Sequence, residues 1–296
     1  MKFLYQFHLE LSQLKPGQQA LLVAGLGLGL QYFLSAVSYF ELLPDFAGIS
    51  LNGVLGNTTF LIFGVLAVSG CFYFEGRAGL ARLFRPYLLI VFNPLYWVFA
   101  CLILVPLLYL SLLLDDILYL RSPVAHGLKL PTIEEVIHWA PIFLQVAICD
   151  ELFWIGFIYP RLVHAGFSPL KASMVMGILW GLDYIPYLFN DFLVASQLNI
   201  PSLLFGWLAL TPIYVWLYHR TGSAILLLVF NVFMQFEYGV LPILPHDTGD
   251  NNLTAMSNLV CFSFGVLLWR IAPGTKVKMK PLVMRSALTA KVISQS

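Results

Sequence analysis

The stretch Cys149-Asp150-Glu151-Leu152-Phe153-Trp154-Ile155-Gly156-Phe157 places two adjacent carboxylates inside an otherwise apolar segment. From Ala140 to Leu162 the other residues are mainly Ile, Leu, Phe, Val, Trp and Ala. An acidic residue at the centre of a membrane helix costs roughly 2.5–3.5 kcal/mol even on the translocon insertion scale. The segment stays apolar for roughly ten more residues, or about 15 Å of helix, which argues against a wet helix end. We therefore interpret the Asp150–Glu151 pair as a site that faces the interior of a helix bundle.

The composition of the chain is that of a polytopic membrane protein. Hydrophobic residues make up 59% of it and charged residues 10%, with a mean hydropathy of +0.83, whereas soluble domains carry about 25% charged residues. We predict an all-α transmembrane helix bundle of about eight spans, because each span takes about 20 residues. The expected spans cover approximately residues 20–40, 58–74, 87–114, 132–161, 169–189, 203–218, 223–244 and 255–269. The lipid bilayer is the expected surrounding, and no nucleic-acid partner is expected.

The distribution of Lys and Arg predicts the orientation in the membrane. Basic residues gather in alternate loops and in the tail, at Lys2, Lys15, Arg77, Arg82, Arg85, Arg161, Lys171, Arg220 and across 270–291. Lys and Arg accumulate on the cytoplasmic side of membrane proteins. We therefore predict that both termini lie in the cytoplasm and that the loop around residues 190–201 lies outside. The expected membrane is the plasma (inner) membrane.

The polar loops divide the chain into three expected parts. Residues 1–130 hold the N-terminal transmembrane helices, about three spans. Residues 131–246 form a central core that contains the carboxylate pair, and residues 247–296 hold the last span and a basic cytoplasmic tail. In the first part, Gly25 and Gly29 are expected to let another helix approach closely, as small residues do in membrane bundles.

Few polar side chains remain inside the predicted spans, and these are the candidate site residues. They are Gln145, Asp150 and Glu151 in the fourth span, Asp183 and Tyr184 in the fifth, and Asn231, Gln235 and Glu237 in the seventh. Because a bilayer cannot satisfy such groups, we expect Glu151, Tyr184 and Asn231 to converge on one another. Asp150 and Asp183 are then expected to support that centre or to pair helices.

These residue types limit the chemistry of the site. A buried carboxylate can act as a general base on water, and amide or phenol groups can donate hydrogen bonds to an oxyanion. No histidine lies deep in a predicted span, and the four cysteines lack metal-type spacing. A catalytic zinc usually has at least one imidazole or thiolate ligand, so the residues do not favour a metal site, and no cofactor is predicted.

The order and spacing of three motifs resemble the CPBP family, the CAAX prenyl proteases and bacteriocin-processing (Abi) enzymes. Asp150-Glu151-Leu152-Phe153-Trp154-Ile155-Gly156, with Pro160-Arg161-Leu162 behind it, resembles the family's Glu-Glu-x-x-x-Arg motif. Trp180-Gly181-Leu182-Asp183-Tyr184 resembles the second motif, which ends in His. Asn231-Val232-Phe233-Met234-Gln235 resembles the third, His-x-x-x-Asn or Asp. The resemblance covers residues from about 140 to 240.

The resemblance implies an intramembrane endopeptidase that cuts a prenylated or leader peptide from the cytoplasmic side. It assigns catalytic positions to Glu151, Asp150, Tyr184, Asn231 and Gln235, and it leaves a divalent metal open as a cofactor. Only Glu151 matches the family's functional residues outright, as the carboxylate that activates water. Ile155 stands where the motif has Arg, and Tyr184 and Asn231 stand where it has His.

These departures leave three functions open. The site is an atypical, weakly active peptidase, or it is non-catalytic and binds a peptide, lipid or membrane-protein partner. The third is a proton-coupled transporter, because intramembrane carboxylates also serve proton relays. The loss of the cation and of both imidazoles favours the non-catalytic function.

Overall fold

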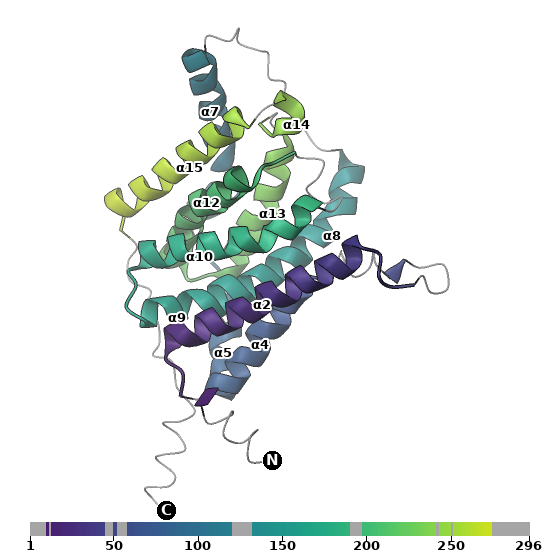
Figure 1. The fold of residues 1–296 in the computed structure, drawn as a ribbon. Helices are drawn as coiled ribbons and strands as arrows, with labels where there is room; N and C mark the ends of the chain where they lie inside the picture. The colour runs from purple at the N-terminus through teal and green to yellow at the C-terminus, as the bar shows by residue number, and fades with distance from the viewer. Residues whose placement is uncertain are drawn as a thin grey trace, which may run out of the picture.

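The protein is a bundle of helices, seen here in a computed structural model (Figure 1). The structure describes residues 10–11, 13–44, 50–51, 58–119, 132–189, 197–240, 243–249 and 251–273, and within these ranges it contains no strand. The α-helices are α2 (Pro16–Tyr39), α4 (Leu61–Glu75), α5 (Arg77–Phe84), α6 (Pro94–Leu102), α7 (Leu104–Tyr119), α8 (Ile133–Asp150), α9 (Tyr159–His164), α10 (Pro169–Tyr184), α12 (Ile200–Thr221), α13 (Ala224–Val240), α14 (Pro245–Thr248) and α15 (Asn252–Ile271). Two 3₁₀ turns, η1 (Arg85–Leu88) and η3 (Ile185–Phe189), and one π-helix, η2 (Glu151–Ile158), complete them. The predicted all-α class is confirmed.

The protein is an integral membrane protein, and its apolar helices follow the predicted spans. Within the described ranges, five helical segments are long and apolar enough to cross a bilayer: Pro16–Tyr39, Ile133–His164, Pro169–Phe189, Ile200–Thr221 and Asn252–Ile271. A sixth span is formed if the bent pair Pro94–Leu102 and Leu104–Leu118, at 41° to each other, crosses together. Two more apolar helices, Leu61–Glu75 and Ala224–Phe236, are shorter. Each of the predicted spans therefore has a helical counterpart, although two of these are short.

The third predicted span differs most from expectation, because its first residues are not helical. Pro94 begins α6, with Asn93 accepting a hydrogen bond from the Leu95 amide at 3.0 Å, so this proline starts a helix and does not kink one. Backbone carbonyls in the segment before it are satisfied by side chains. Ser223 Oγ donates to the Leu89 carbonyl at 2.6 Å, and Trp97 Nε1 donates to the Val91 carbonyl at 2.8 Å. Such partners permit non-helical backbone beside a bilayer.

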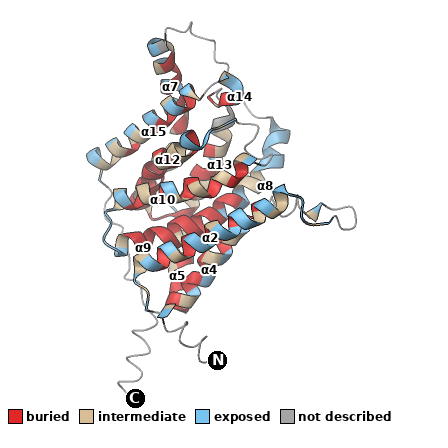
Figure 2. Ribbon diagram, in the orientation of Figure 1, coloured by how far each residue is buried: buried red, intermediate tan, exposed pale blue. Residues whose placement is uncertain are grey.

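The buried side chains concentrate around the helices that carry the candidate site. Helix α12 packs between α10 and α15, α4 lies against α8 and η2, and α2 lies against α9 and η3 (Figure 1). Figure 2 shows buried residues along α9 and α12, whereas α2 exposes much of its outer face. The exposed side chains on α2 include large apolar ones such as Leu21 and Phe33, which suits contact with lipid.

The close helix contact in α2 is made at a different glycine from the pair expected. A Cβ added to Gly27 would lie 2.7 Å from Cε1 of Phe63, whereas one added to Gly25 or Gly29 would meet no described residue within 4 Å. The expectation for Gly25 and Gly29 is therefore wrong, because these residues face away from α4. Elsewhere, the basic tail at 274–296, the residues 190–196 and the side chain of Glu237 lie outside the described part of the chain.

Candidate functional site

The carboxylate pair lies at the junction between an α-helix and a π-helix. Helix α8 begins with a capping box, in which Thr132 Oγ1 accepts from the Glu135 amide at 3.2 Å and Glu135 accepts from the Thr132 amide at 2.7 Å. It ends at Asp150, and the π-helix η2 starts at Glu151. Such π-helical segments are rare and occur often at functional sites. The same stretch that carries the motif thus has an uncommon backbone.

Both carboxyl groups are buried, and each meets a different tyrosine. Asp150 and Glu151 are each 1% exposed. The Tyr214 hydroxyl of α12 donates to Glu151 Oε1 at 2.9 Å, and the Tyr184 hydroxyl of α10 donates to Asp150 Oδ2 at 3.5 Å. The sequence predicts that Glu151 belongs to the centre and that Asp150 supports it or pairs helices. The structure instead turns both side chains inward, towards two neighbouring helices.

Helix α13 adds two amides to the side of Glu151. Asn231 is 1% exposed and lies close to Tyr214. Gln235 Nε2 donates to Asn231 Oδ1 at 3.5 Å. Within the described ranges, Glu151 Oε2 and Asn231 Nδ2 have no hydrogen-bond partner. Glu151 Oε2 is thus an unused acceptor and Asn231 Nδ2 an unused donor, two of several such buried atoms in this part of the bundle.

Asp183 lies on the other side of the pair. It is 2% exposed and close enough to Asp150 for their charges to interact, and its Oδ1 has no partner among the described residues. Among the hydrogen bonds of these residues, the Tyr184 hydroxyl bonds to Asp150 and not to Glu151 or Asn231. The structure therefore forms two linked groups, one through Tyr214 and one through Tyr184.

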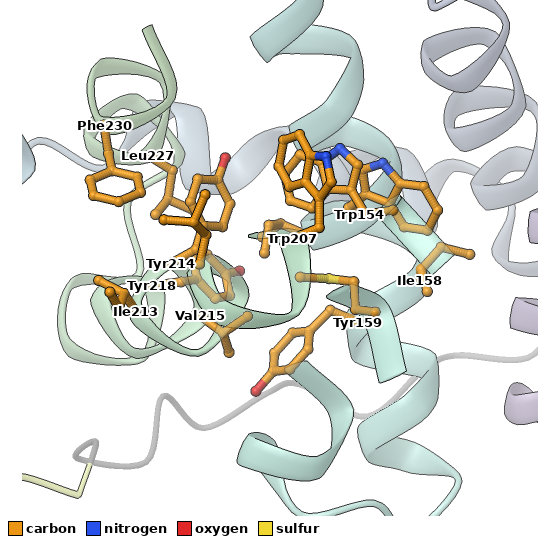
Figure 3. Close-up of a cluster of buried hydrophobic side chains, with 14 of the residues drawn as sticks. Trp154, Ile158, Tyr159, Trp207, Ile213, Tyr214, Val215, Tyr218, Leu227 and Phe230 are labelled. Carbon is orange, nitrogen blue, oxygen red and sulfur yellow. The ribbon is translucent and has the colours of Figure 1, made fainter. Parts of the chain in front are cut away.

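Aromatic rings form one wall of the site. Trp180 stacks on Trp207 with ring centroids 4.5 Å apart and on Trp154 at 5.8 Å. Tyr184 packs on Trp207 at 4.6 Å and Tyr214 on Trp180 at 5.5 Å. Figure 3 shows Trp154, Trp207 and Tyr214 within this buried cluster, with Phe230 beyond Tyr214. Both tyrosine hydroxyls that meet the carboxyl groups are thus held by packed rings.

The comparison with protein families matches this region of the chain. Residues 132–236 match the family model described as type II CAAX prenyl endopeptidase Rce1-like. The chain contains an Rce1-like domain. The match confirms the resemblance read from the three motifs, and it includes Asp150, Glu151, Asp183, Tyr184, Asn231 and Gln235 but ends one residue before Glu237. The search of curated proteins gave no match.

The residues of the Rce1-like domain do not fit a metal centre. Among the described residues, no group of three or more His, Cys, Asp or Glu side chains could hold a metal ion. His219 is buried, but its Nε2 is hydrogen-bonded to the Tyr159 hydroxyl, away from the carboxylate pair. The site offers three carboxyl groups, two phenol hydroxyls and two amides in an apolar surrounding.

Tyr214 is the site residue that sequence reasoning missed. It lies inside the predicted span 203–218, and counting tyrosine as a polar residue there would have found it. Its partner Glu151 and its neighbour Asn231 were both identified by that rule. Its hydroxyl is buried, and a buried phenol usually finds a hydrogen-bond partner.

The sequence also did not predict the ion pairs formed by charges that it places at the membrane surface. Arg161 is expected at the end of the fourth span, and Glu75 follows the second span in the loop of Arg77, Arg82 and Arg85, yet they are 0% and 3% exposed. They form an ion pair at 2.5 Å. Arg82, also expected in that loop, pairs with the same carboxylate at 2.7 Å. Glu75 and Arg161 can be buried because these charges satisfy one another, and the side chain of Arg82 is 18% exposed. Arg77, Arg85 and Lys171 remain exposed on that side of the bundle.

Proposed function

We propose that the Rce1-like domain binds a prenylated or leader-type peptide and hydrolyses it very weakly or not at all. Binding would take place from the cytoplasmic side of the plasma (inner) membrane, with both termini of the chain in the cytoplasm. The family match supports the peptide as ligand class. The surroundings of Glu151 support the loss of hydrolysis.

The observation that carries this proposal is the set of partners around Glu151. A carboxyl that serves as a general base must be charged when it takes a proton from water. A charge in an apolar site is costly unless a counter-charge or several hydrogen bonds stabilise it. Among the described residues, Glu151 has one hydrogen bond, from Tyr214, and the position of the motif's arginine holds Ile155. Its charged form is therefore poorly supported.

The stabilisation of the oxyanion that forms during peptide hydrolysis is also weakened. Peptide hydrolysis needs donors for the oxyanion, and the loss of one such donor typically costs about 2.7–4 kcal/mol of transition-state stabilisation. Tyr184 and Asn231 occupy the positions where the family has imidazoles. The Tyr184 hydroxyl already donates to Asp150. It would have to leave that carboxyl before it could serve an oxyanion.

One observation favours an active peptidase as the second candidate. Glu151 Oε2 and Asn231 Nδ2 have no partner among the described residues, and both are buried. An acceptor for a water proton and a donor for an oxyanion on facing helices would suffice for slow hydrolysis. In this function Tyr214 would orient Glu151.

Binding and cleavage can be separated with one purified protein in lipid nanodiscs. A fluorescent prenylated peptide and its unprenylated twin are titrated for binding, and mass spectrometry follows product formation. We expect saturable binding of the prenylated peptide with little or no product, and unchanged binding after Glu151→Gln. Rapid cleavage that Glu151→Gln abolishes would establish the second candidate. Failure to bind either a prenylated or a leader peptide would refute the proposal, and pH-dependent solute uptake by vesicles would point to a transporter.

A further inference from the structure

A buried cluster of charges lies next to the π-helix. Glu75, at the end of α4, accepts hydrogen bonds from Arg82 of α5 on both carboxylate oxygens, at 2.9 and 2.7 Å. Arg161 of α9 donates to the same carboxylate at 2.5 Å. We call these three residues the arginine clamp. Burial alone would lower the pKa of Arg82, but the hydrogen bond and charge of Glu75 raise it above its ordinary value.

One further donor of each arginine reaches the backbone of the π-helix, while Arg161 Nε donates to Gln19 Oε1 of α2 at 3.0 Å. Arg82 Nη1 donates to the Gly156 carbonyl at 3.0 Å, and Arg161 Nη1 donates to the Phe157 carbonyl at 3.1 Å. These are consecutive carbonyls near the end of η2. The Arg161 guanidinium also lies 3.6 Å from the centre of the Phe157 ring. One carboxylate thus joins two arginines that hold adjacent peptide groups.

Helix α5 is pressed against the π-helix at the same point. A Cβ added to Gly156 would lie 2.3 Å from Cδ1 of Leu83, which is one residue from Arg82. Glycine at 156 therefore allows the approach that brings Arg82 to the Gly156 carbonyl. The contact is specific to this backbone position, because only a residue without a side chain leaves room there.

The register of the π-helix decides where the site residues point. A π-helical segment closes i→i+5 hydrogen bonds in place of the i→i+4 bonds of an α-helix and so accommodates about one extra residue. If η2 relaxed to α-helix, the chain before it would turn by about 100° relative to the chain after it. Asp150 and Glu151 lie at the start of η2, and the arginine clamp lies at its end. A turn of this size would remove both carboxyl groups from their tyrosine partners.

We infer that the arginine clamp holds the π-helix in register and thereby positions the Asp150–Glu151 pair. Glu75, Arg82 and Arg161 are positioning residues in this arrangement, since they act through the backbone of η2. Release of Arg161, which is 0% exposed, would also leave a buried cation with fewer partners, which is strongly unfavourable. This cost keeps the clamp closed in the folded protein.

The register can be measured with one cysteine pair on each side of η2. Before it, Gly64→Cys faces the native Cys149, and the added Cβ lies 3.5 Å from the Cys149 Cβ, within the range for a disulfide. After it, Gly17→Cys faces Ala165→Cys, with the two Cβ atoms 3.0 Å apart. The second pair is made in a Cys149→Ala protein. Cys101 and Cys261 are replaced by Ala in both, and disulfide formation is followed by mass spectrometry after oxidation.

The clamp variants are then compared with matched controls. We expect Glu75→Gln to lower the rate of disulfide formation in one cysteine pair by at least about tenfold, since misplaced groups react much more slowly. The rate in the other pair should stay within about twofold of that in the parent protein. Helix content should stay unchanged. Glu75→Asp and Arg82→Lys, which keep the charges, should retain both rates, and so should Arg77→Gln on the exposed face of α5.

Two outcomes would overturn the inference. One is parental rates for both pairs in Glu75→Gln, and the other is an equal fall in both rates together with the melting temperature, which would indicate general loosening. If Glu75→Gln does not fold, Arg82→Gln decides by the same criteria. No peptide enters this measurement, so it is independent of the proposed function, which peptide binding tests separately.

Discussion

The hydrogen bond from Tyr214 to Glu151 gives the most direct test of the site geometry. Replacing Tyr214 by Phe removes the only described donor to Oε1, and Oε2 already lacks one. The variant would therefore bury a carboxyl group with no hydrogen bond from the described residues. Interhelical hydrogen bonds in membrane proteins average about 0.6 kcal/mol, with a maximum near 1.7, whereas an unsatisfied buried group costs about 1–3 kcal/mol. We expect the Tyr214→Phe change to lower the free energy of unfolding by about 1–2 kcal/mol.

A double-mutant cycle isolates this interaction from other effects of losing the hydroxyl. In a Glu151→Leu background, Tyr214→Phe should cost much less, because the carboxyl that needs the hydroxyl is gone. The coupling between the two changes should be about 1–2 kcal/mol. Unfolding of purified protein in mixed micelles, titrated with denaturing detergent, gives the four free energies.

The control for the cycle is Tyr39→Phe. Tyr39 is 57% exposed on α2, so Tyr39→Phe should change the free energy of unfolding by no more than about 0.5 kcal/mol. Additivity of Tyr214→Phe and Glu151→Leu to within about 0.5 kcal/mol would refute the reasoning. The buried site would then not depend on the bond that the structure shows.

Three further predictions follow from the packing, the charges and the motif. Gly177→Ala should destabilise the protein by about 1–3 kcal/mol, because its Cβ would lie 2.4 Å from Thr211 Oγ1 and 2.9 Å from the Trp207 carbonyl. Gly25→Ala, which meets no described residue within 4 Å, should be neutral or stabilising in the same unfolding assay. Gln197→Cys should react with an impermeant reagent on intact cells and Lys171→Cys only after permeabilisation, and the reverse would contradict the predicted orientation. Restoring the motif with Ile155→Arg, Tyr184→His and Asn231→His together should raise peptide cleavage more than any single change, and an equal effect of one change alone would count against the proposed cause of the weak activity.

The helices could be predicted from the sequence because lipid imposes a simple rule. Each span must be apolar for about 20 residues, and the runs of Leu, Ile, Phe and Val show this directly. The non-helical segment at residues 89–93, before α6, was not predictable in the same way. It depends on side chains such as Ser223, which is 134 positions away from the carbonyl it bonds.

The residues of the site could be predicted from the sequence, but the contacts between them could not. Polar residues in apolar spans are rare, so Glu151 and Asn231 stand out. The contact between Glu75 and Arg161 joins residues 86 positions apart, and a charge that pairs across the bundle looks the same in sequence as one in a loop. The π-helix also has no local signal, because Glu151–Ile158 is as apolar as an ordinary span.

The stack of Trp154, Trp180 and Trp207 makes the assembled bundle optically visible. The three indoles come from η2, α10 and α12, and neighbouring rings lie within about 20° of parallel, at 21° and 18°. Indoles this close couple their electronic transitions and give a strong near-ultraviolet circular dichroism signal that separated helices lack. Any movement of η2 relative to α10 or α12 would change that signal. The protein thus carries an intrinsic chromophore beside its carboxylate pair, and opening of the site can be followed in unlabelled protein within a native membrane.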